Sequence, residues 1–331
     1  MTNFYKKFKK TMGEINLKEV TVNANDAGQR LDRFLTKLMP NMPQGMLYKS
    51  LRKDCVKING KHIKDGAFRL SEGDELKLYM KDEFFERPDP DTAFLSITPQ
   101  LDIVYEDENI ILADKKQGMC VHADDSGDTN TLIEHIKAYL YRSGEFKPEE
   151  ENTFVPALAN RIDRNTGGIV IAAKNAETLR ILNQKIKDRE IEKKYLCMVY
   201  GHPYPENGEI RGYLFKDEVK KQVYVYDEPR KGTKTMLTKY RVLEKYKESA
   251  LVEAKLETGR THQIRAGFAH IGHPLLGDGK YGTNEINRRF PYSCQALYSY
   301  KLKFAFVTDG GILEYLNNCE FEIKNVHFAK K

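Results

Sequence analysis

Apolar residues near the start of the chain recur at the spacing of a helix. Residues 27–39 (AGQRLDRFLTKLM) place four of them at positions i, i+3, i+4 and i+7: Leu31, Phe34, Leu35 and Leu38. This spacing predicts a helix with one apolar face. After a break at Pro40 and Pro43, residues 45–54 (GMLYKSLRKD) repeat the pattern, and four of them are predicted to face inward: Met46, Leu47, Ser50 and Leu51. The sequence therefore predicts two short helices that share a core.

Short strands are predicted to follow these helices. Residues 55–63 (CVKINGKHI) contain two β-prone arms around Asn59-Gly60, a dipeptide that favours a tight hairpin turn. A further strand is predicted at residues 74–80 (DELKLYM). Two helices and a small hairpin sheet make a compact domain, which we place at residues 17–81.

The apolar pattern of the later residues predicts an α+β domain. Residues 101–115 hold two alternating apolar stretches. Helices are predicted at residues 129–144 and 176–189, and three apolar residues of the second helix share a face: Leu179, Leu182 and Ile186. Further strands are predicted at five places: residues 193–201, 220–227, 234–246, 250–259 and 300–306. Consecutive strands joined by short loops favour a mainly antiparallel sheet.

A segment rich in proline and acidic residues separates the two predicted domains. Residues 82–99 contain three prolines, and their charged residues are mostly acidic. This composition is typical of a linker. We therefore place the second domain at residues 100–331.

The composition excludes several classes of protein. With 40% hydrophobic and 31% charged residues, the chain is typical of a globular protein. Its longest apolar runs are about seven residues, far short of the roughly 18–20 that cross a bilayer, and residues 1–16 lack the apolar segment of a secretory signal. The five cysteines are scattered, without a C-x-x-C pair, which argues against disulfides and a zinc site. We expect a cytoplasmic protein.

Positive charge is concentrated in the first predicted domain. The net charge of the whole chain is +6. Residues 1–81 contain 17 Lys and Arg against 9 Asp and Glu, a net charge of +8, whereas residues 82–91 carry −4 and residues 92–331 carry +2. A basic module attached to a nearly neutral body is typical of proteins that bind a polyanion.

Basic residues lie off the apolar faces of the two predicted helices and in the strand that follows. Six of them are candidates for contacts with RNA phosphates: Arg30, Arg33, Lys49, Arg52, Lys53 and Lys57. The alternative is an ordinary solvated helix face, but the local charge of +8 favours RNA binding. The segment resembles the small α-L RNA-binding domain first seen in a ribosomal small-subunit protein, and the matching stretches are AGQRLDRFL, LRKDCVKINGK and GDELKL.

A cluster of charged residues precedes a predicted core strand at residues 160–175 (NRIDRNTGGIVIAAKN). Arg161 and Asp163 are two residues apart and could face one cleft, while Gly167-Gly168 permits a close approach of backbone and ligand. The apolar run Ile169–Ala173 would anchor the loop in the core. Most such loops are only polar connections; the alternative is a carboxylate held rigidly at a catalytic site. This motif alone leaves both interpretations open.

A second polar motif lies at residues 256–282 (LETGRTHQIRAGFAHIGHPLLGDGKYG). Its three histidines have no Cys or carboxylate partner in a recognised metal-binding pattern, so we expect no metal site. Arg260 and Arg265 are expected to bind an anion or a carboxylate, because a guanidinium stays charged and can hold a carboxylate through two hydrogen bonds. The GDGKYG segment lacks the spacing of a phosphate-binding loop, and we predict a turn there.

Four blocks, in this order, resemble the RluA-type pseudouridine synthases: VYEDENIILADKKQGMCVH, NRIDRNTGGIVIAAKN, EKKYLCMVYG and LETGRTHQIRAGFAHIGHPLLGDGKYG. The resemblance covers nearly the whole chain. It implies a bent, mainly antiparallel central sheet, no cofactor and no metal. The chain departs from the family pattern at three places, where the family usually has His at Asn160, Ser at Gly167, and Asn-Lys-Pro at Asp114-Lys115-Lys116. None of these departures removes a charged catalytic group.

The resemblance also implies roles for particular residues. Asp163 is expected to act as nucleophile or base, Arg265 as its ionic partner, and Tyr195 as the tyrosine that packs on the target base. Arg161 is expected to fill the gap left by a flipped uridine or to hold the RNA backbone. The remaining predicted contacts with the substrate are Thr166, Arg260, His262 and Gln263.

Together these patterns predict a monomeric bacterial enzyme that converts uridines of structured RNA to pseudouridine. Large-subunit ribosomal RNA is the expected substrate, and transfer RNA is the alternative. A non-catalytic RNA-binding protein of the same fold would be expected to have lost the acid, yet Asp163, Tyr195 and Arg265 are all present. A hydrolytic glycosidase usually needs two carboxylates about 5–10 Å apart, and we find no second acid with a suitable context in the four blocks.

Overall fold

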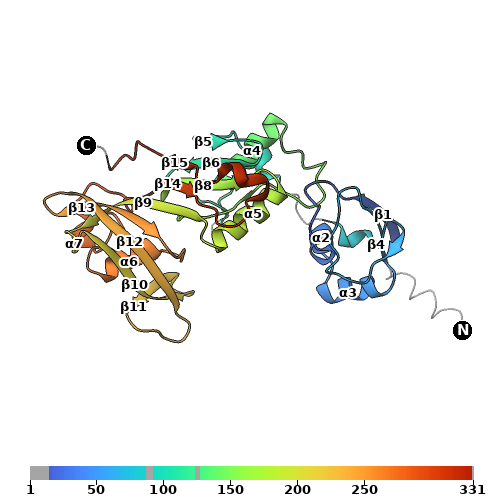
Figure 1. The fold of residues 1–331 in the computed structure, drawn as a ribbon, viewed down its shortest axis with the longest axis horizontal. Coiled ribbons are helices and arrows are strands. Elements are labelled where there is room, and N and C mark those ends of the chain that lie inside the picture. The colour runs from blue at the N-terminus through green and yellow to red at the C-terminus, as the bar shows by residue number, and fades with distance from the viewer. Residues whose placement is uncertain (1–14, 87–91, 124–126, 330–331) are drawn as a thin grey trace, which may run out of the picture. The chain divides into compact units, whose positions relative to one another are not determined.

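The computed structural model describes residues 15–86, 92–123 and 127–329 (Figure 1). Two parts of our sequence predictions lie outside the described residues: the N-terminal residues 1–14 and residues 87–91 of the predicted linker. No helix among the described residues is both long and apolar enough to cross a bilayer.

The chain divides into two compact units. Unit 1 consists of Met1–Ser96 and Tyr139–Pro156, and unit 2 of Ile97–Ala138 and Ala157–Lys331. The second segment of unit 1 falls inside the range 100–331 that we predicted as one continuous domain. Hydrogen bonds explain this difference, because the buried carboxylate of Asp26 accepts from Nδ2 of Asn152 at 2.7 Å and from Oγ1 of Thr153 at 2.6 Å.

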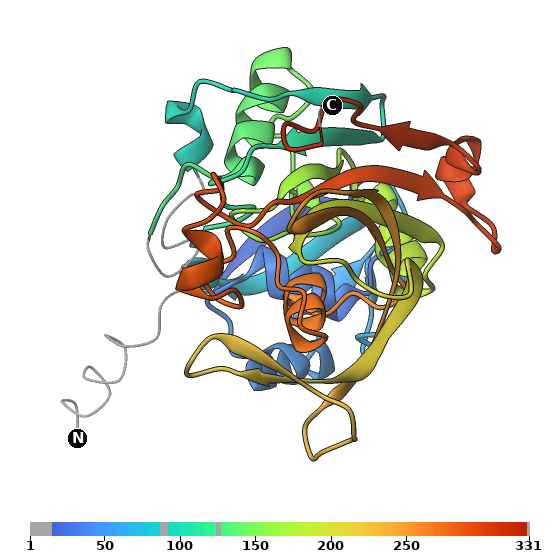
Figure 2. The same ribbon diagram turned by 90° about the vertical axis from the view of Figure 1, so that its left-hand side faces the viewer.

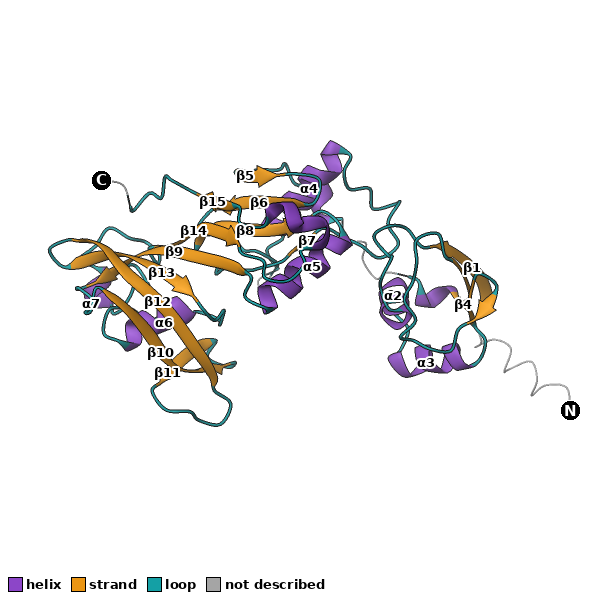
Figure 3. Ribbon diagram, viewed as in Figure 1, coloured by secondary structure: helices purple, strands orange, loops and turns teal. Residues whose placement is uncertain are grey.

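Within its described residues, unit 1 contains two complete helices and a four-stranded antiparallel sheet (Figure 3). The helices are α2 (Leu31–Leu38) and α3 (Gln44–Arg52). The strands pair in the order β1-β4-β2-β3, and their bounds are Ile15–Thr21 for β1, Val56–Ile58 for β2, Lys61–His62 for β3 and Glu75–Lys81 for β4. Asn59 and Gly60 have φ angles of 50° and 78°, so the predicted hairpin turn between β2 and β3 is confirmed. Two short 3-10 turns follow, η1 (Asp82–Phe84) and η2 (Ala93–Ser96).

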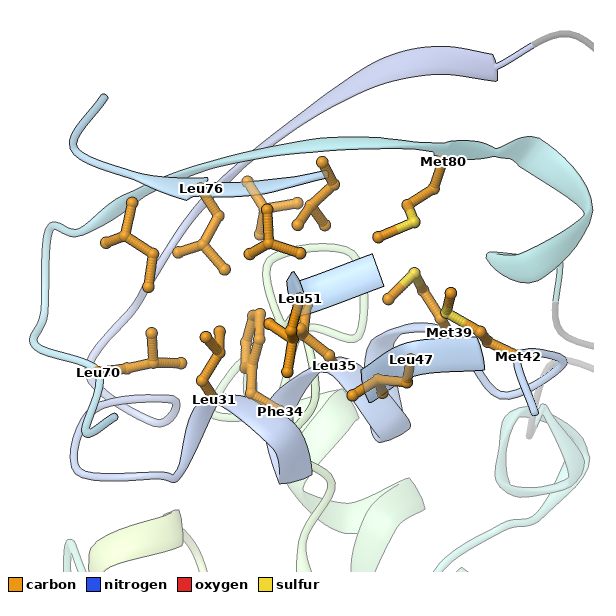
Figure 4. Close-up of a cluster of buried hydrophobic side chains, with 14 of the residues drawn as sticks. Leu31, Phe34, Leu35, Met39, Met42, Leu47, Leu51, Leu70, Leu76 and Met80 are labelled. Atoms are coloured by element: carbon orange, nitrogen blue, oxygen red, sulfur yellow. The ribbon is translucent and has the colours of Figure 1, made fainter. Parts of the chain in front are cut away.

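The apolar faces of α2 and α3 pack in one core with the sheet (Figure 4). The predicted face of α2 is confirmed, since three of its residues are fully buried and the fourth is partly buried against the same core: Leu31, Phe34, Leu35 and Leu38. On α3, Leu47 and Leu51 are buried, but Met46 is 44% exposed, and its predicted inward orientation is wrong. Met46 stands about 100° around the helix axis from Leu47, outside the stripe that Leu47 and Leu51 form.

Unit 2 is built on an eleven-stranded sheet within the described residues (Figures 1 and 2). Its strand order is β11-β10-β12-β13-β9-β14-β8-β6-β5, with β15 paired to β14 and β7 paired to β8. The bounds are β5 Ile103–Glu106, β6 Ile110–Lys115, β7 Ala157–Leu158, β8 Gly167–Ala173, β9 Ile191–Tyr200, β10 Asn207–Asp217, β11 Gln222–Tyr226, β12 Lys234–Lys245, β13 Ser249–Leu256, β14 Leu297–Phe304 and β15 Glu320–Glu322. Among these described pairs only β14 and β8 run parallel. The predicted α+β class with a mainly antiparallel sheet is confirmed.

Short helices pack against this sheet. They are α5 (Ala176–Lys187), α6 (Gln263–His270), α7 (Asn284–Asn287) and η3 (Gly311–Leu316); α4 (Leu132–Ser143) runs along the chain from unit 2 into unit 1. The predicted apolar face of α5 is confirmed, because Leu182 is buried and Leu179 and Ile186 pack beside it against the core of β8. The cap residue Asn175 begins α5 by accepting a hydrogen bond from the backbone N–H of Thr178 at 2.8 Å.

Strand β10 was absent from our prediction. Its buried positions alternate, with Ile210, Gly212 and Leu214 facing inward between neighbours that are exposed or half-buried. Because one of the inward positions is glycine, the period-two signal is weak in the sequence. Helix α6 packs against β10, β11 and β12, so this region of the sheet supports the second polar motif.

Candidate active site

A cavity of about 730 Å³ opens in unit 2. It is lined by the loop that precedes β8, by β9, by the end of β13 and by the start of α6. All eight residues that we predicted to act on or bind the substrate line this one cavity: Arg161, Asp163, Thr166, Tyr195, Arg260, His262, Gln263 and Arg265. The structure therefore brings together two motifs that are about one hundred residues apart.

The loop that carries Asp163 is tied to the end of β6. Lys115 is fully buried, and its ammonium donates hydrogen bonds to three backbone carbonyls, including that of Arg164 at 2.8 Å. The side chain of Gln117 donates to the carbonyl of Asn165 at 3.0 Å. Burial lowers the pKa of Lys115 to about 8. These bonds fix the backbone on the C-terminal side of Asp163.

The two glycines after this loop let β8 approach β14 closely. A Cβ on Gly167 would lie 2.3 Å from Cε2 of Tyr298, and one on Gly168 would lie 2.2 Å from the carbonyl oxygen of Ser299. Gly168 also has a φ of 110°, a conformation that residues with a Cβ rarely adopt. From Gly167 to Ala173 every residue of β8 is buried, so the strand anchors the loop as predicted.

Asn160 connects the N-terminal side of the Asp163 loop to β8. Its Oδ1 accepts a hydrogen bond from the backbone N–H of Ile171 at 2.8 Å, and its buried Nδ2 has no hydrogen-bond partner among the described residues. This departure from the family pattern therefore has a structural role in pinning the loop to β8.

Asp163 is held by an arginine from α6. Nη1 of Arg265 donates to Oδ2 of Asp163 at 2.7 Å. The other side of the guanidinium faces Asp278, with Nε donating to Oδ2 at 2.7 Å and Nη2 donating to Oδ1 at 2.9 Å. Arg265 thus bridges two carboxylates, of which Asp163 is partly exposed to the cavity and Asp278 is fully buried. Such a fixed fork orients the carboxylate of Asp163.

Asp278 is a second acid near Arg265 that the sequence patterns did not single out, and all of its side chain is buried. Burial by itself would raise the pKa of Asp278, but the hydrogen bonds from Arg265 hold this pKa below its usual value. The backbone N–H groups of Lys280 and Tyr281 also donate to its Oδ1. The GDGKYG turn therefore serves to hold Arg265.

Two further acids, Glu192 and Glu257, line the cavity. Each has a lysine partner on a neighbouring strand: Nζ of Lys255 lies 2.9 Å from Oε1 of Glu192, and Nζ of Lys239 lies 3.3 Å from Oε1 of Glu257. Asp163 differs from both because its partner comes from a buried network rather than from the rim.

His262 lies beside Asp163 in a neutral form. It precedes α6 with a φ of 53°, and its Nε2 lies 3.7 Å from Oδ2 of Asp163 while its Nδ1 hydrogen bonds with the hydroxyl of Tyr281 at 2.8 Å. Burial lowers the pKa of His262 despite the nearby carboxylate of Asp163. In the part of the chain that the structure describes, no cluster of three or more His, Cys, Asp or Glu side chains is arranged to hold a metal ion.

Tyr195 forms a buried wall of the cavity. It stands on β9 opposite Ser299 of β14, and its side chain hydrogen bonds with that serine. Burial, with a smaller contribution from the charge of Asp163, raises the pKa of Tyr195 to about 12. The phenol is therefore protonated at neutral pH.

Of the remaining predicted contacts, two side chains are exposed at the cavity and two form hydrogen bonds within the protein. Arg161 and Arg260 are exposed at the cavity. The hydroxyl of Thr166 is buried and accepts a hydrogen bond from Gln295. Gln263 uses its whole amide internally, donating to Leu237 and Thr238 and accepting from Thr258 and Arg260. Gln263 thereby shapes the loop that carries Arg260.

In unit 1, the six predicted RNA-binding residues are not equivalent. Four are exposed and make no hydrogen bond or ion pair with any described residue: Arg33, Lys49, Arg52 and Lys53. Arg30 instead pairs with Asp32 through two hydrogen bonds of 3.1 and 2.7 Å. The ammonium of Lys57 lies 3.6 Å from Asp54 and 5.8 Å from the ring centre of Tyr79. The uncompensated charge therefore belongs to the α2–α3 residues.

Four residues important for the geometry were missed from the sequence: Lys115, Asp278, Tyr281 and Ser299. The sequence signals for Lys115 and Asp278 are weak. Lys115 is a lysine directly before a predicted loop, and Asp278 is an aspartate in a glycine turn. Each acquires its structural role only through partners elsewhere in the chain. The hydroxyl of Tyr281 accepts a hydrogen bond from the backbone N–H of Val223, and it also hydrogen bonds with Nδ1 of His262.

The sequence of the chain is similar to those of known proteins. Residues 109–270 match the family model described as RNA pseudouridylate synthase. The chain is 34% identical over 275 residues to the "Ribosomal large subunit pseudouridine synthase C" of Vibrio cholerae, covering 82% of this chain and 81% of that protein. Its identity to the protein of the same name from Escherichia coli is 31% over 277 residues, covering 83% and 82%.

Solved structures show a similar fold. The human proteins "RNA Pseudouridylate Synthase Domain Containing 1" and "RNA Pseudouridylate Synthase Domain Containing 4" superpose with TM-scores of 0.52 and 0.53 at 21% and 19% identity. The superposition covers 67% of this chain and 83% of the first structure, and 68% of this chain and 89% of the second.

Proposed function

The chain belongs to the RNA pseudouridylate synthase family and is an RNA pseudouridine synthase, an isomerase, and we propose that it acts on large-subunit ribosomal RNA with Asp163 as the nucleophile. The observation that carries the proposal is the 2.7 Å contact between Arg265 and Asp163 in a cavity that Tyr195 also lines. The substrate is proposed from the names of the Vibrio and Escherichia relatives and from the net charge of +8 on residues 1–81.

The reaction replaces one bond of the nucleoside with another. The bond between C1′ of ribose and N1 of uracil breaks, the base turns, and a bond from C1′ to C5 forms. The proton that C5 loses is balanced by the proton that N1 gains, so the net change is an isomerisation. The carboxylate of Asp163 attacks either C1′ or the uracil ring, and it leaves again when the new bond forms. We propose no metal or cofactor in any of these steps.

Asp163 must be ionised to act in this way. The guanidinium of Arg265, 2.7 Å away, supplies a positive charge beside this carboxylate. Since Asp278 holds the far side of the guanidinium, Arg265 does not need to reorganise while charge shifts on Asp163.

Tyr195 supports the proposal as a packing surface for the target base. Its hydroxyl hydrogen bonds with Ser299 and its pKa is raised to about 12, so the ring is held in place and the phenol stays neutral. An aromatic face of this kind binds a uracil that has left its stack. Arg161 is proposed to occupy the gap or hold the backbone, and Arg260, Thr166 and His262 to complete the substrate contacts.

The experiment that tests the proposal is chemical mapping of pseudouridine in ribosomal and transfer RNA from cells that lack the gene. Purified protein should restore the missing sites in the large-subunit RNA, and Asp163→Asn should abolish this while RNA binding persists. If the missing sites lie in transfer RNA, the alternative substrate is correct. If the protein modifies no RNA at all, the chain is a non-catalytic RNA-binding protein and the proposal is wrong. The monomeric state and the cytoplasmic location also stay predictions.

A further inference from the structure

Five basic side chains line the cavity but have no part in the chemistry proposed above. Two of them, Lys216 and Lys255, are paired with Glu218 and Glu192 at 2.8 and 2.9 Å. The other three lie close together in the chain. Lys187 is the last residue of α5, Arg189 lies in the turn after it, and Lys193 is on β9. Arg189 has a φ of 64°, in the left-handed region that few residues other than glycine occupy. This residue turns the chain from α5 into β9, so all three cations come from one short segment.

These three cations have no partner within the described residues. The side chains of Lys187, Arg189 and Lys193 make no hydrogen bond or ion pair there. Their neighbours differ, because Lys194 lies 3.6 Å from Glu253 and Lys255 lies 2.9 Å from Glu192. Those two neighbouring lysines of the sheet are thus each compensated by a carboxylate.

Nearby acids do not neutralise the group. Asp188 lies between Lys187 and Arg189 in the chain, but it does not line the cavity and its carboxylate accepts a hydrogen bond from Gln184 at 2.6 Å. Glu190 is buried and engaged by Lys185 at 2.6 Å. The positive charge at the cavity is therefore open to a ligand.

Lys193 differs from Lys187 and Arg189 because it is half-buried. Exposed lysines are commonly just solvated, whereas Lys193 is half-buried. Burial lowers the pKa of its ammonium to about 8, which means that this charge is partly removed from water without a counter-charge. An anion in the cavity would supply that counter-charge.

Lys193 lies near Tyr195, on which the target base is proposed to pack. Lys193 and Tyr195 are two residues apart on β9, so their side chains point to the same face of the sheet, about 7 Å apart along the strand. A base packed on Tyr195 carries its own backbone phosphates at a distance of this order. The anion that reaches Lys193 is then part of the substrate RNA.

We propose that Lys187, Arg189 and Lys193 form a subsite for the phosphates of the RNA strand next to the target uridine. The proposal rests on the proposed function, because it takes the substrate of the cavity to be RNA. It names a contact that is separate from the catalytic group Asp163 and from the basic residues of unit 1.

The test is the salt dependence of RNA binding by the full-length chain. A fluorescent RNA hairpin of about 20 nucleotides, long enough to span several phosphate contacts, serves as the probe in fluorescence anisotropy across a range of NaCl concentrations, in an Asp163→Asn background that prevents turnover. Lys193→Met should weaken binding and reduce the slope of log K against log[NaCl] by roughly 0.7–0.9, and Lys187→Gln/Arg189→Gln by about twice that amount. Lys193→Arg should retain the slope, because its charge is preserved.

Lys194→Met is the matched control, because Lys194 follows on the same strand and already pairs with Glu253. The slope of log K against log[NaCl] for Lys194→Met should equal that of the chain without this substitution. If Lys193→Met and the Lys187→Gln/Arg189→Gln variant both give the slope of this control, the subsite does not exist. Should Lys193→Met fail to fold, the Lys187→Gln/Arg189→Gln variant still decides the question. Pseudouridine formation is measured separately, so absence of product contradicts the proposed function without deciding the binding slopes.

Discussion

The space beside Gly167 is limited by a single side chain of β14. The space that a Cβ would need at Gly167 is occupied by the ring of Tyr298, whose hydroxyl donates to Oδ1 of Asp114 at 2.6 Å. Gly167 and Asp114 are two of the places where the chain departs from the pattern of the RluA-type enzymes, and Tyr298 contacts both. At the residue scale, these departures are therefore one connected arrangement next to the loop that carries Asp163.

Gly167→Ser should destabilise the protein by about 1–3 kcal/mol, because the new Cβ would overlap the ring of Tyr298. Urea unfolding monitored by circular dichroism measures this change. Gly45→Ser is the control, since a Cβ added at Gly45 would meet no other part of the chain within 4 Å. In combination with Tyr298→Ala the cost should be smaller than the sum of the two single effects; additive effects would show that the two residues are not coupled.

At the scale of elements, the turn from α5 to β9 is held by a buried ion pair. Nζ of Lys185 lies 2.6 Å from Oε2 of Glu190, and it also donates to the hydroxyl of Thr308 at 2.8 Å. The backbone N–H of Val307 donates to Glu190 at 3.1 Å. This network ties the end of α5 and the start of β9 to the segment before η3, and so sets the position of the proposed phosphate subsite.

The pH dependence of stability should reveal this network. The hydrogen bond from Lys185 lowers the pKa of Glu190 from 4.5 to about 2, against the opposing effect of burial. Since the folded pKa lies below the unfolded one, the contribution of Glu190 is complete above about pH 4.5 and is lost as the pH falls toward 2. Glu190→Gln should therefore lower the melting temperature at neutral pH and have a diminishing effect below about pH 4.

Melting curves followed by circular dichroism between about pH 7 and about pH 3 measure this difference. The exposed Glu228, which makes no hydrogen bond or ion pair with a described residue, provides the control through Glu228→Gln. A constant difference between Glu190→Gln and the unsubstituted protein across this range would contradict the assignment.

At the scale of the whole molecule, both units present positive charge that no carboxylate of the described residues compensates. Unit 1 presents the uncompensated cations of α2, α3 and the residue after α3, while unit 2 contains the cavity with Asp163. We propose that the first group contacts RNA phosphates, which would add affinity without reading sequence. The choice of uridine is then left to the cavity and its surroundings.

Replacement of Arg33, Lys49, Arg52 and Lys53 by Gln should reduce the salt slope of RNA binding by roughly 3, at about 0.7–0.9 for each lost phosphate contact. Lys77→Gln is the control, because Lys77 is already paired with Glu19 at 2.9 Å. Substitution is preferable to deletion of residues 1–81, which would leave Asn152 and Thr153 without Asp26. An unchanged slope in the fourfold variant would remove unit 1 from the RNA-binding surface.

Local patterns in the sequence were sufficient for several parts of the protein. Apolar spacing determined α2 and α5, and Asn59-Gly60 determined the hairpin of β2 and β3. Asp163 and Arg265 were singled out by the resemblance of four sequence blocks to the RluA-type enzymes, and not by a local pattern alone. Each of the structural signals lies within about twelve neighbouring residues, where backbone geometry alone relates the side chains.

Only the tertiary structure decided how these parts meet. It placed Arg265 at 2.7 Å from Asp163, 102 residues away in the chain, and gave that arginine its second partner, Asp278. It also buried Lys115 against the loop that carries Asp163 and assigned Tyr139–Pro156 to unit 1. The physical reason is that hydrogen bonds and packing between distant segments depend on strand order and register, which the spacing of residues along one segment does not specify.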